Sequence, residues 1–249
     1  MKILGVIPAR YASSRFPAKA LYQIAGKSMV QRVYEQACRA QSLYEVVVAT
    51  DHALIYQHIE ALGGKVVMTA ESHPSGTDRC YEALQKVGGD FDFVLNIQGD
   101  EPFIQPAQID TLAEVLQDPA VEIATLMKKI SDAAEIFDEN EVKITFNTRH
   151  EALYFSRSPI PFIHKFGTHE WPFRFDFYKH VGLYAYRSDV LAQITALSPS
   201  PLEQSESLEQ LRWLEHGFKI RLAVTALDSF CIDVPADIEG VDISRFLKD

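Results

Sequence analysis

The 249-residue sequence predicts an α/β fold in which a parallel sheet is followed by antiparallel or mixed β structure. Up to about residue 120, short β-branched runs alternate with segments whose apolar residues recur at helical spacing, a pattern typical of parallel strands joined by crossover helices. Beyond Val121, strand-like runs follow one another with little helix between them. Hydrophobic residues make up 47% of the chain and charged residues 23%, as in ordinary folded proteins.

The first half of the chain contains four strand-and-helix units. The first strand is the apolar run Ile3 to Ile7, and the first helix begins behind Ser28, whose hydroxyl is a possible N-cap. The predicted strands are 3–7, 45–50, 65–68 and 91–97, and the predicted helices are 29–38, 54–62, 77–87 and about 106–116.

The second half is richer in strands. We predict strands at 122–130, 142–147, 152–156, 178–187 and 219–225, a short helix at 132–136, one helix at 201–216, a strand ending near 231–232, and a closing helix after Pro235. Prolines and aromatic residues crowd residues 157–179, which are too apolar for a free linker and are expected to pack on a neighbour or a second subunit. We find no repeat and no linker, so residues 1–249 are predicted to form a single domain.

Charge and cysteine content limit the classes of partner. The 24 Lys and Arg against 34 Asp and Glu give a net charge of -10, so a nucleic-acid partner is not expected. No apolar stretch reaches the roughly 18 residues of a membrane span, and the N-terminus lacks a signal peptide pattern. Three cysteines without metal-ligand spacing (Cys38, Cys80 and Cys231) are expected to be buried thiols of a cytoplasmic protein.

The loop after the first strand is built to meet an anion. From Met1 to Tyr34 there are six cations and no acidic residue. Arg10, Arg15 and Lys19, with the hydroxyls of Ser13 and Ser14, supply the donors that a triphosphate needs, although a solvated basic loop is the simpler alternative. The loop matches neither a G-x-G-x-x-G turn nor a Walker loop.

Two aspartates follow apolar runs and are candidate metal ligands. Asp100 lies in the turn after the 91–97 strand, and Asp233 precedes Pro235. In an open α/β sheet, ligands bind beyond the carboxyl ends of the strands, where two carboxylates and phosphate oxygens suit Mg²⁺. A turn-forming aspartate and a helix N-cap are equally good readings of these residues taken alone.

Two other segments are weaker candidates. Ser75-Gly76-Thr77, which enters a helix ahead of Arg79, exposes backbone N–H groups that can bind a base or a phosphate, but such turns are common. His180 lies on a strand and faces either a pocket or the core. The histidines have no zinc-site spacing, so a zinc enzyme is not expected.

Taken together, these segments resemble the CMP-Kdo synthetases, the 3-deoxy-manno-octulosonate cytidylyltransferases of lipopolysaccharide synthesis. The resemblance runs along nearly the whole chain in one order. Its motifs are IPARYASSRFPAKAL, VATD at 48–51, SGTDR at 75–79, NIQGDEP at 96–102, ALYFSR at 152–157, KHVGLYAYR at 179–187, SPLEQSESLEQLR at 200–212 and IDVPAD at 232–237.

The resemblance implies a nucleotide-diphospho-sugar transferase-like fold, a Rossmann-type mixed sheet with a smaller β-rich dimerisation subdomain. Residues 1–120 would then be the nucleotide-binding half, and about 121–190 the β-rich part for sugar binding and dimerisation. The implied enzyme is a homodimer that joins CTP to Kdo and releases pyrophosphate.

The resemblance also assigns roles to residues of this chain. Arg10, Ser13 and Lys19 would hold the triphosphate, with Arg15 beside them, and Asp100 and Asp233 would bind Mg²⁺. Ser75, Gly76, Thr77 and Arg79 would lie by the cytidine. The Kdo pocket would be lined by Gln98, Arg157, His180, Tyr184, Glu209 and Gln210, with Arg157 suited to the sugar carboxylate.

The sequence departs from the family pattern at two places. Ala18 and Ala20 stand where the family usually has Gly and Pro, which changes the backbone freedom beside Lys19. Residues 162–165 read Phe-Ile-His-Lys where many members have a Trp-Asp-Arg stretch, so an amino-substituted Kdo is an alternative substrate.

Three other functions remain as alternatives. CMP-sialate synthesis fits the first loop poorly, because that loop usually has an IPARGGSKGIP-like form. A nucleotide-sugar glycosyltransferase would normally show a D-x-D motif, whereas Glu101-Pro102 follows Asp100. A non-catalytic nucleotide-binding protein would be expected to lose Lys19, Asp100 or Asp233, and all three are present.

Overall fold

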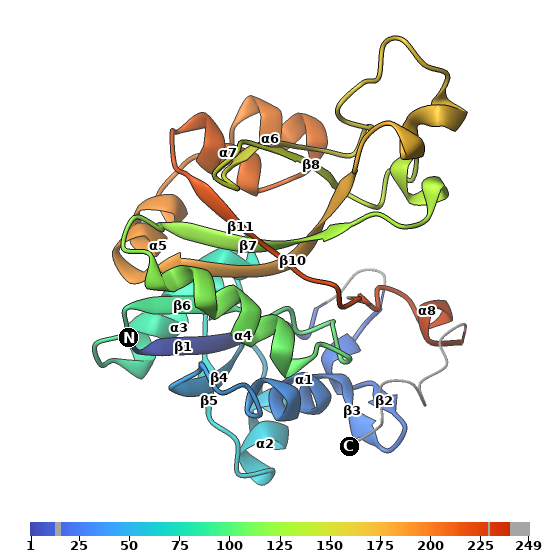
Figure 1. Cartoon of the computed structure of the whole chain (residues 1–249). Coiled ribbons are helices and arrows are strands. Elements are labelled where there is room, and N and C mark those ends of the chain that lie inside the picture. Colours follow the sequence, from blue (N-terminus) through green and yellow to red (C-terminus); the bar gives the residue numbers. More distant parts are fainter. Residues whose placement is uncertain (13–15, 229, 240–249) are drawn as a thin grey trace. The chain divides into compact units, whose positions relative to one another are not determined.

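The computed structural model describes residues 1–12, 16–228 and 230–239, and it divides the chain into two compact units (Figure 1). The first unit comprises residues 1–110 and the segment after residue 228, and the second comprises residues 111–228. None of the helices in the described residues is long and apolar enough to cross a membrane.

The first unit is built on four parallel strands in the order β6-β1-β4-β5. The bounds of these strands are β1 Ile3–Ala9, β4 Glu45–Thr50, β5 Val66–Met68 and β6 Phe93–Asn96. The helices that follow or join them are α1 Met29–Ala37, α2 Ala53–Ala61, α3 Gly76–Val87 and α8 Ala236–Glu239, while α4 (Pro106–Glu114) leads into the second unit. The predicted parallel α/β arrangement of the first half is confirmed.

The order of these strands reverses at β1. From β1 the chain adds β4 and β5 on one side and then returns to place β6 on the other side. Such a reversal opens a crevice between the two loops that leave the central strands, because those loops depart in opposite directions. The loops after β1 and β6 are therefore the expected edges of a binding site.

The second unit is a mixed sheet, as predicted. Strand β7 (Ile123–Lys129) pairs antiparallel with β10 (Tyr178–Arg187) and parallel with β11 (Ile220–Val224). Strand β8 (Lys143–Phe146) pairs antiparallel with β9 (Ala152–Ser156) and with the start of β10. Two short 3₁₀ helices, Ala133–Ile136 and Thr168–Phe173, contribute to a separate apolar cluster of Ile130, Ile136, Trp171 and Phe177.

Several predicted elements differ from the structure. The helix expected at 201–216 is two helices, α6 (Pro201–Glu206) and α7 (Gln210–Glu215), because Ser207 between them has a left-handed backbone with φ 53°. Helix α5 (Ser188–Thr195) was not predicted, although Val190, Leu191 and Ile194 have helical spacing and are buried.

Two predictions near the cysteines are wrong. Cys231 and Ile232 belong to no strand; the backbone N–H of Ile232 instead donates to the carbonyl of Asp100 at 2.9 Å. All three cysteines are free, but only Cys80 is buried, and Cys38 and Cys231 are exposed.

A small hairpin follows the first loop and was also not predicted. Strands β2 (Gln23–Ile24) and β3 (Lys27–Ser28) are joined by Ala25 and Gly26, whose φ angles are 45° and 79°. A two-residue turn with two positive φ angles favours Asn-Gly, and Ala at the first position is strained.

We expect Ala25→Asn to raise the free energy of unfolding by about 1 kcal/mol, because asparagine tolerates the left-handed backbone that alanine resists. Urea denaturation of the purified protein measures the change. The control is Ala61→Asn in α2, which should lower stability slightly because asparagine is the poorer helix former. A destabilising Ala25→Asn would contradict the assigned strain.

Candidate active site

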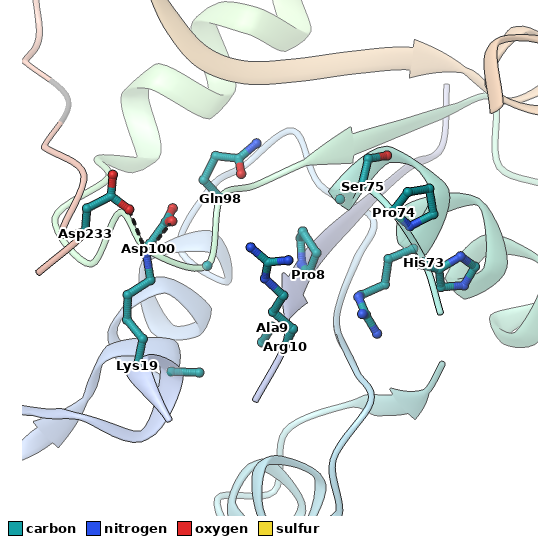
Figure 2. Close-up of a pocket in the computed structure, with 14 residues that line it drawn as sticks. Pro8, Ala9, Arg10, Lys19, His73, Pro74, Ser75, Gln98, Asp100 and Asp233 are labelled. Carbon is teal, nitrogen blue, oxygen red and sulfur yellow. Dashed lines mark hydrogen bonds and ion pairs between the residues drawn. The ribbon is translucent and has the colours of Figure 1, made fainter. Parts of the chain in front are cut away.

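A pocket of about 330 Å³ opens in the first unit beside the carboxyl ends of β1 and β6 (Figure 2). Its volume is within the range of small-molecule sites. The residues that line it are Pro8, Ala9, Arg10, Lys19, Ala20, His73, Pro74, Ser75, Gly76, Arg79, Gln98, Gly99, Asp100 and Asp233. The structure thus brings five separated segments to the position that the strand order predicts.

One end of the pocket is a lysine between two carboxylates. The Nζ atom of Lys19 lies 2.8 Å from Oδ2 of Asp100 and 3.2 Å from Oδ1 of Asp233 (Figure 2). Burial alone would lower the pKa of Lys19, but the charge of Asp100 and hydrogen bonds to both aspartates outweigh it, so the pKa is raised. Lys19 therefore remains a cation at neutral pH.

Backbone packing holds Asp100 in place. A Cβ on Gly99 would lie 2.5 Å from the carbonyl oxygen of Pro8, so only glycine lets the turn after β6 approach the end of β1 this closely. The bond from Ile232 to the carbonyl of Asp100 then brings Asp233 alongside.

A small apolar cluster joins the three segments that carry these side chains. Its buried members are Phe16, Ile24, Met29, Phe103 and Ile232, and the partly buried Phe230 and Ile238 pack against it. Burial of these side chains gives the loop before Lys19 and the segment before Asp233 a fixed position, since neither belongs to the sheet.

The other end of the pocket is formed by the residues just before and within α3. The hydroxyl of Ser75 caps this helix, because it accepts from the N–H of Asp78 at 3.2 Å and donates to the Asp78 carboxylate at 2.6 Å. Ser75 and Gly76 therefore offer mainly backbone groups to a ligand.

Arg79 lines the same end, and its guanidinium is committed to the protein. It donates to the Asp51 carboxylate at 2.9 Å and to the hydroxyl of Thr69 at 2.6 Å. Its side chain is only 4% exposed. Asp51 also accepts from the backbone N–H of Tyr11 at 3.0 Å, so this pair ties the first loop to α3.

The remaining predicted residues of this unit fall in three groups. Arg10 and Gln98 line the pocket, as expected. Thr77 is buried and is not part of the lining. Ser13 and Arg15 lie outside the described residues.

The Lys19 end of the pocket fits a divalent cation. One ligand atom from each of Asp100, Asp233 and Cys231 lie within 4.8 Å of one another. The two carboxylates match the oxygen preference of Mg²⁺, whereas a cysteine sulfur is a soft ligand that Mg²⁺ does not favour. The positively charged ammonium group of Lys19 already lies between these two carboxylates. Asp100 and Asp233 are thus the residues that would hold Mg²⁺.

The second unit contains a separate group of partly satisfied polar side chains. Strand β10 has an irregular register between Val181 and Tyr184, and Thr125 on β7 bonds to the carbonyls of Val181 and Leu183 across it. The rings of His180 and Tyr184 are 5.1 Å apart, and Nε2 of His180 lies 3.0 Å from the Thr125 hydroxyl.

Burial controls the charge of both rings. Desolvation lowers the pKa of His180 to about 3, so the imidazole is neutral at physiological pH. Burial first, and then the charge of Glu209, raises the pKa of Tyr184. Both side chains are therefore neutral hydrogen-bonding groups.

Helix α7 contributes further polar side chains to the same unit. The side chain of Gln210 is buried, and the Trp213 ring packs edge-on against Tyr184 at 5.3 Å. Within the described chain, the Tyr184 hydroxyl, Gln210 Nε2 and Trp213 Nε1 are buried without a hydrogen-bond partner. Buried polar atoms are normally paired, so these three indicate a place for a polar ligand.

Arg157 follows β9 in the same unit. Its Nε donates to the carbonyl of Glu206 at 2.8 Å, and one terminal nitrogen donates to the carbonyl of Glu139 at 3.0 Å. An arginine has five N–H donors, so these bonds fix the side chain and leave others for an anion. The predicted joint role of Gln98 with these second-unit residues stays a prediction.

The sequence analysis does not identify three residues at or beside the pocket. His73 lines it, Asp51 pairs with Arg79, and Cys231 lies beside Asp100 and Asp233. A signal existed for Cys231, because it lies two residues before Asp233.

Comparisons with known proteins identify the family. A family model described as Cytidylyltransferase matches residues 4–220. The chain is 53% identical over 239 residues to the 3-deoxy-manno-octulosonate cytidylyltransferase of Cytophaga hutchinsonii, covering 96% of this chain and 95% of that protein. It is 46% identical over 241 residues to the 8-amino-3,8-dideoxy-manno-octulosonate cytidylyltransferase of Shewanella pealeana, covering 96% of each.

A solved structure agrees with these relatives. The CMP:2-keto-3-deoxy-manno-octonic acid synthetase in complex with CTP superposes with a TM-score of 0.89 at 46% identity, covering 96% of both chains. The nucleotide-diphospho-sugar transferase-like fold expected from the sequence is confirmed. The chain belongs to the cytidylyltransferase family and, within it, to the CMP-Kdo synthetases.

Proposed function

We propose that this protein transfers the cytidylyl group of CTP to Kdo, giving CMP-Kdo and pyrophosphate for lipopolysaccharide synthesis. The observation that carries the proposal is the placement of Lys19 between Asp100 and Asp233 at one end of a nucleotide-sized pocket, in a chain of this family.

The reaction is a substitution at the α-phosphorus of CTP. The anomeric hydroxyl of Kdo forms the new oxygen–phosphorus bond, the bond to the β-phosphate breaks, and pyrophosphate leaves with the electron pair. A tertiary hydroxyl is a poor nucleophile, so the protein has to align it and neutralise the charge that develops on the phosphates.

Lys19 and Arg10 are suited to that neutralisation. Lys19 is held as a cation by its two aspartates, and Arg10 extends from the end of β1 into the same pocket. When CTP binds, its phosphate oxygens can exchange with the carboxylates around Lys19, which frees Asp100 and Asp233 for a cation. Bound there, Mg²⁺ would neutralise the phosphates and lower the pKa of the sugar hydroxyl.

For the sugar we propose a role for the polar groups of the second unit. His180, Tyr184 and Gln210 are neutral donors and acceptors that suit hydroxyls, and Arg157 suits the carboxylate of a keto acid. The unpartnered Tyr184 hydroxyl and Gln210 amide support this role. Glu209 contributes charge beside Tyr184.

An amino-substituted Kdo is the second candidate substrate. A relative at 46% identity is named for 8-amino-3,8-dideoxy-manno-octulosonate, so both sugars occur among close relatives. Residues 162–165, where the sequence departs from the usual pattern of the family, lie in a largely exposed segment of the second unit.

We further propose that the protein is a cytoplasmic homodimer. The second unit has five exposed aromatic side chains near its apolar cluster in the sequence: Phe137, Phe162, Phe166, Phe173 and Phe175. Of these, Phe137 and Phe162 contact Trp171 of the cluster, and Phe175 contacts Phe177. Contiguous exposed apolar surface of this kind favours association, and a second copy of the chain is the partner we propose. Three free cysteines suit a reducing compartment.

Pyrophosphate release in the presence of Mg²⁺ tests the reaction. We expect release with CTP and Kdo or its 8-amino analogue, and none with sialic acid. ATP, UTP and GTP serve as nucleotide controls, and the ratio of kcat/KM for the two octulosonates identifies the sugar. Silence with every pair would refute the proposed function.

Asp100→Asn should lower kcat by a hundredfold or more, because it removes an anionic ligand beside the reacting phosphates. Thermal stability should change little, since Lys19 keeps Asp233 as a partner. Mn²⁺ titration followed by electron paramagnetic resonance reports binding directly. Asp90→Asn, on an exposed loop, is the matched control. Normal Mn²⁺ binding by Asp100→Asn would remove Asp100 from the metal site.

Phe173→Asp should shift the protein from dimer to monomer in sedimentation experiments, because Phe173 is 87% exposed and belongs to the exposed aromatic group. Leu54→Asp places the same charge on an exposed position of α2 and should leave the mass unchanged. If the wild-type protein and Phe173→Asp have the same mass in solution, the proposed contact through the exposed aromatic group is refuted.

A further inference from the structure

His73 lines the pocket at the end opposite Lys19, next to Pro74 and Ser75 (Figure 2). Its Nε2 atom is hydrogen-bonded to Oε2 of Glu82, nearly two turns into α3. The same Glu82 oxygen accepts from the backbone N–H of Ala70 at 2.8 Å, and the other oxygen pairs with Lys86 at 2.8 Å. The imidazole ring is therefore held in one orientation on the pocket wall.

This contact fixes the tautomer of His73. Burial alone would raise the pKa of Glu82, but bonds from Lys86, Ala70 and His73 lower it to about 2. The carboxylate is therefore ionised at neutral pH and can only accept, so Nε2 of His73 must carry the proton and donate. In the neutral imidazole, Nδ1 is then an acceptor.

The Nδ1 atom is available to a ligand. Within the described chain, the only hydrogen bond of the His73 ring is the one from Nε2 to Glu82. The side chain is 20% exposed and belongs to the pocket lining. His73 thus brings an acceptor to the wall of the pocket at the end opposite Lys19.

Other side chains of this segment cannot take that role. Pro74 has no polar side-chain atom, and the Ser75 hydroxyl is committed to Asp78. Arg79 can only donate, and its bonds go to Asp51, Thr69 and the carbonyl of Ala70. Among the pocket-lining side chains of residues 73–79, His73 is the one with an acceptor atom that makes no other hydrogen bond in the described structure.

We propose that Nδ1 of His73 accepts a hydrogen bond from the exocyclic amino group of cytosine and so selects CTP over UTP. The proposal rests on the proposed function, because it places the phosphates at the Lys19 end and the base at the His73 end. Uracil carries a carbonyl oxygen where cytosine carries its amino group, so in UTP two acceptors would face each other. Such a mismatch leaves both groups unpaired and rejects the wrong nucleotide.

Nucleotide discrimination tests the proposal. The measured quantity is the ratio of kcat/KM for CTP to that for UTP, with the sugar saturating. His73→Ala should lower this ratio roughly tenfold, about the value of one hydrogen bond. His73→Asn, whose side-chain oxygen can lie near the position of Nδ1, should retain more of the ratio than alanine does. His216→Asn, an exposed histidine of the second unit, should leave it unchanged.

The outcomes separate this proposal from the function on which it rests. If the wild-type protein releases no pyrophosphate with CTP and either octulosonate, the function fails. If it does so and His73→Ala keeps the wild-type ratio, only the role of His73 fails.

A second measurement does not depend on activity. Nitrogen-15 spectra of labelled wild-type protein distinguish the two imidazole tautomers, and the signal missing from His73→Asn assigns the residue. We expect the proton on Nε2 and a shift of the Nδ1 signal when CTP is added without sugar. A proton on Nδ1, or an Nδ1 signal unmoved by saturating CTP, would overturn the proposal.

Discussion

The position of the Lys19 ammonium group between two carboxylates is the constraint on which the site in the first unit depends. Asp100 and Asp233 approach closely enough to repel each other, and the cation between them offsets that repulsion. The same arrangement keeps Lys19 charged despite its burial. In the proposed function, phosphate oxygens would take the place of the carboxylates around Lys19, and a divalent cation would take the place of Lys19 between the carboxylates. The free protein thus holds its reactive residues in place with the interactions that substrates later take over.

Position in the sheet explains why the pocket lies where it does. The order of the parallel strands reverses at β1, and both loops that leave β1 and β6 carry site residues. Gly99 allows the two loops to approach, and the pair of Asp51 and Arg79 fastens the first loop to α3. These features are local to the first unit, so both ends of the pocket are built on one parallel sheet and the segments attached to it.

Much of this arrangement could be predicted from the sequence, because hydrophobic period reveals strands and helices and because ligands gather beyond strand ends. Lys19 and Asp100 were found in that way. The break at Ser207 could not be predicted, since the residues on both sides continue a helical pattern while one backbone angle interrupts it. The backbone hydrogen bond from Ile232 to Asp100 could not be predicted either, because it joins segments more than a hundred residues apart. The tautomer of His73 depends on Glu82, which has no distinguishing motif.

The two units use polar groups in opposite ways, and the proposed function gives a reason for the difference. In the first unit, the polar groups of the Lys19 end satisfy one another, because free charges beside a pocket would be costly. In the second unit, the Tyr184 hydroxyl and the Gln210 amide are buried without partners among the described residues. Each such group destabilises the free protein by about 1–3 kcal/mol. In the proposed function, the carboxylate of the sugar would pair with Arg157, whereas its uncharged hydroxyls would bind through hydrogen bonds to groups such as these, which are completed only when the hydroxyls arrive. The cost to stability is therefore the source of the selectivity.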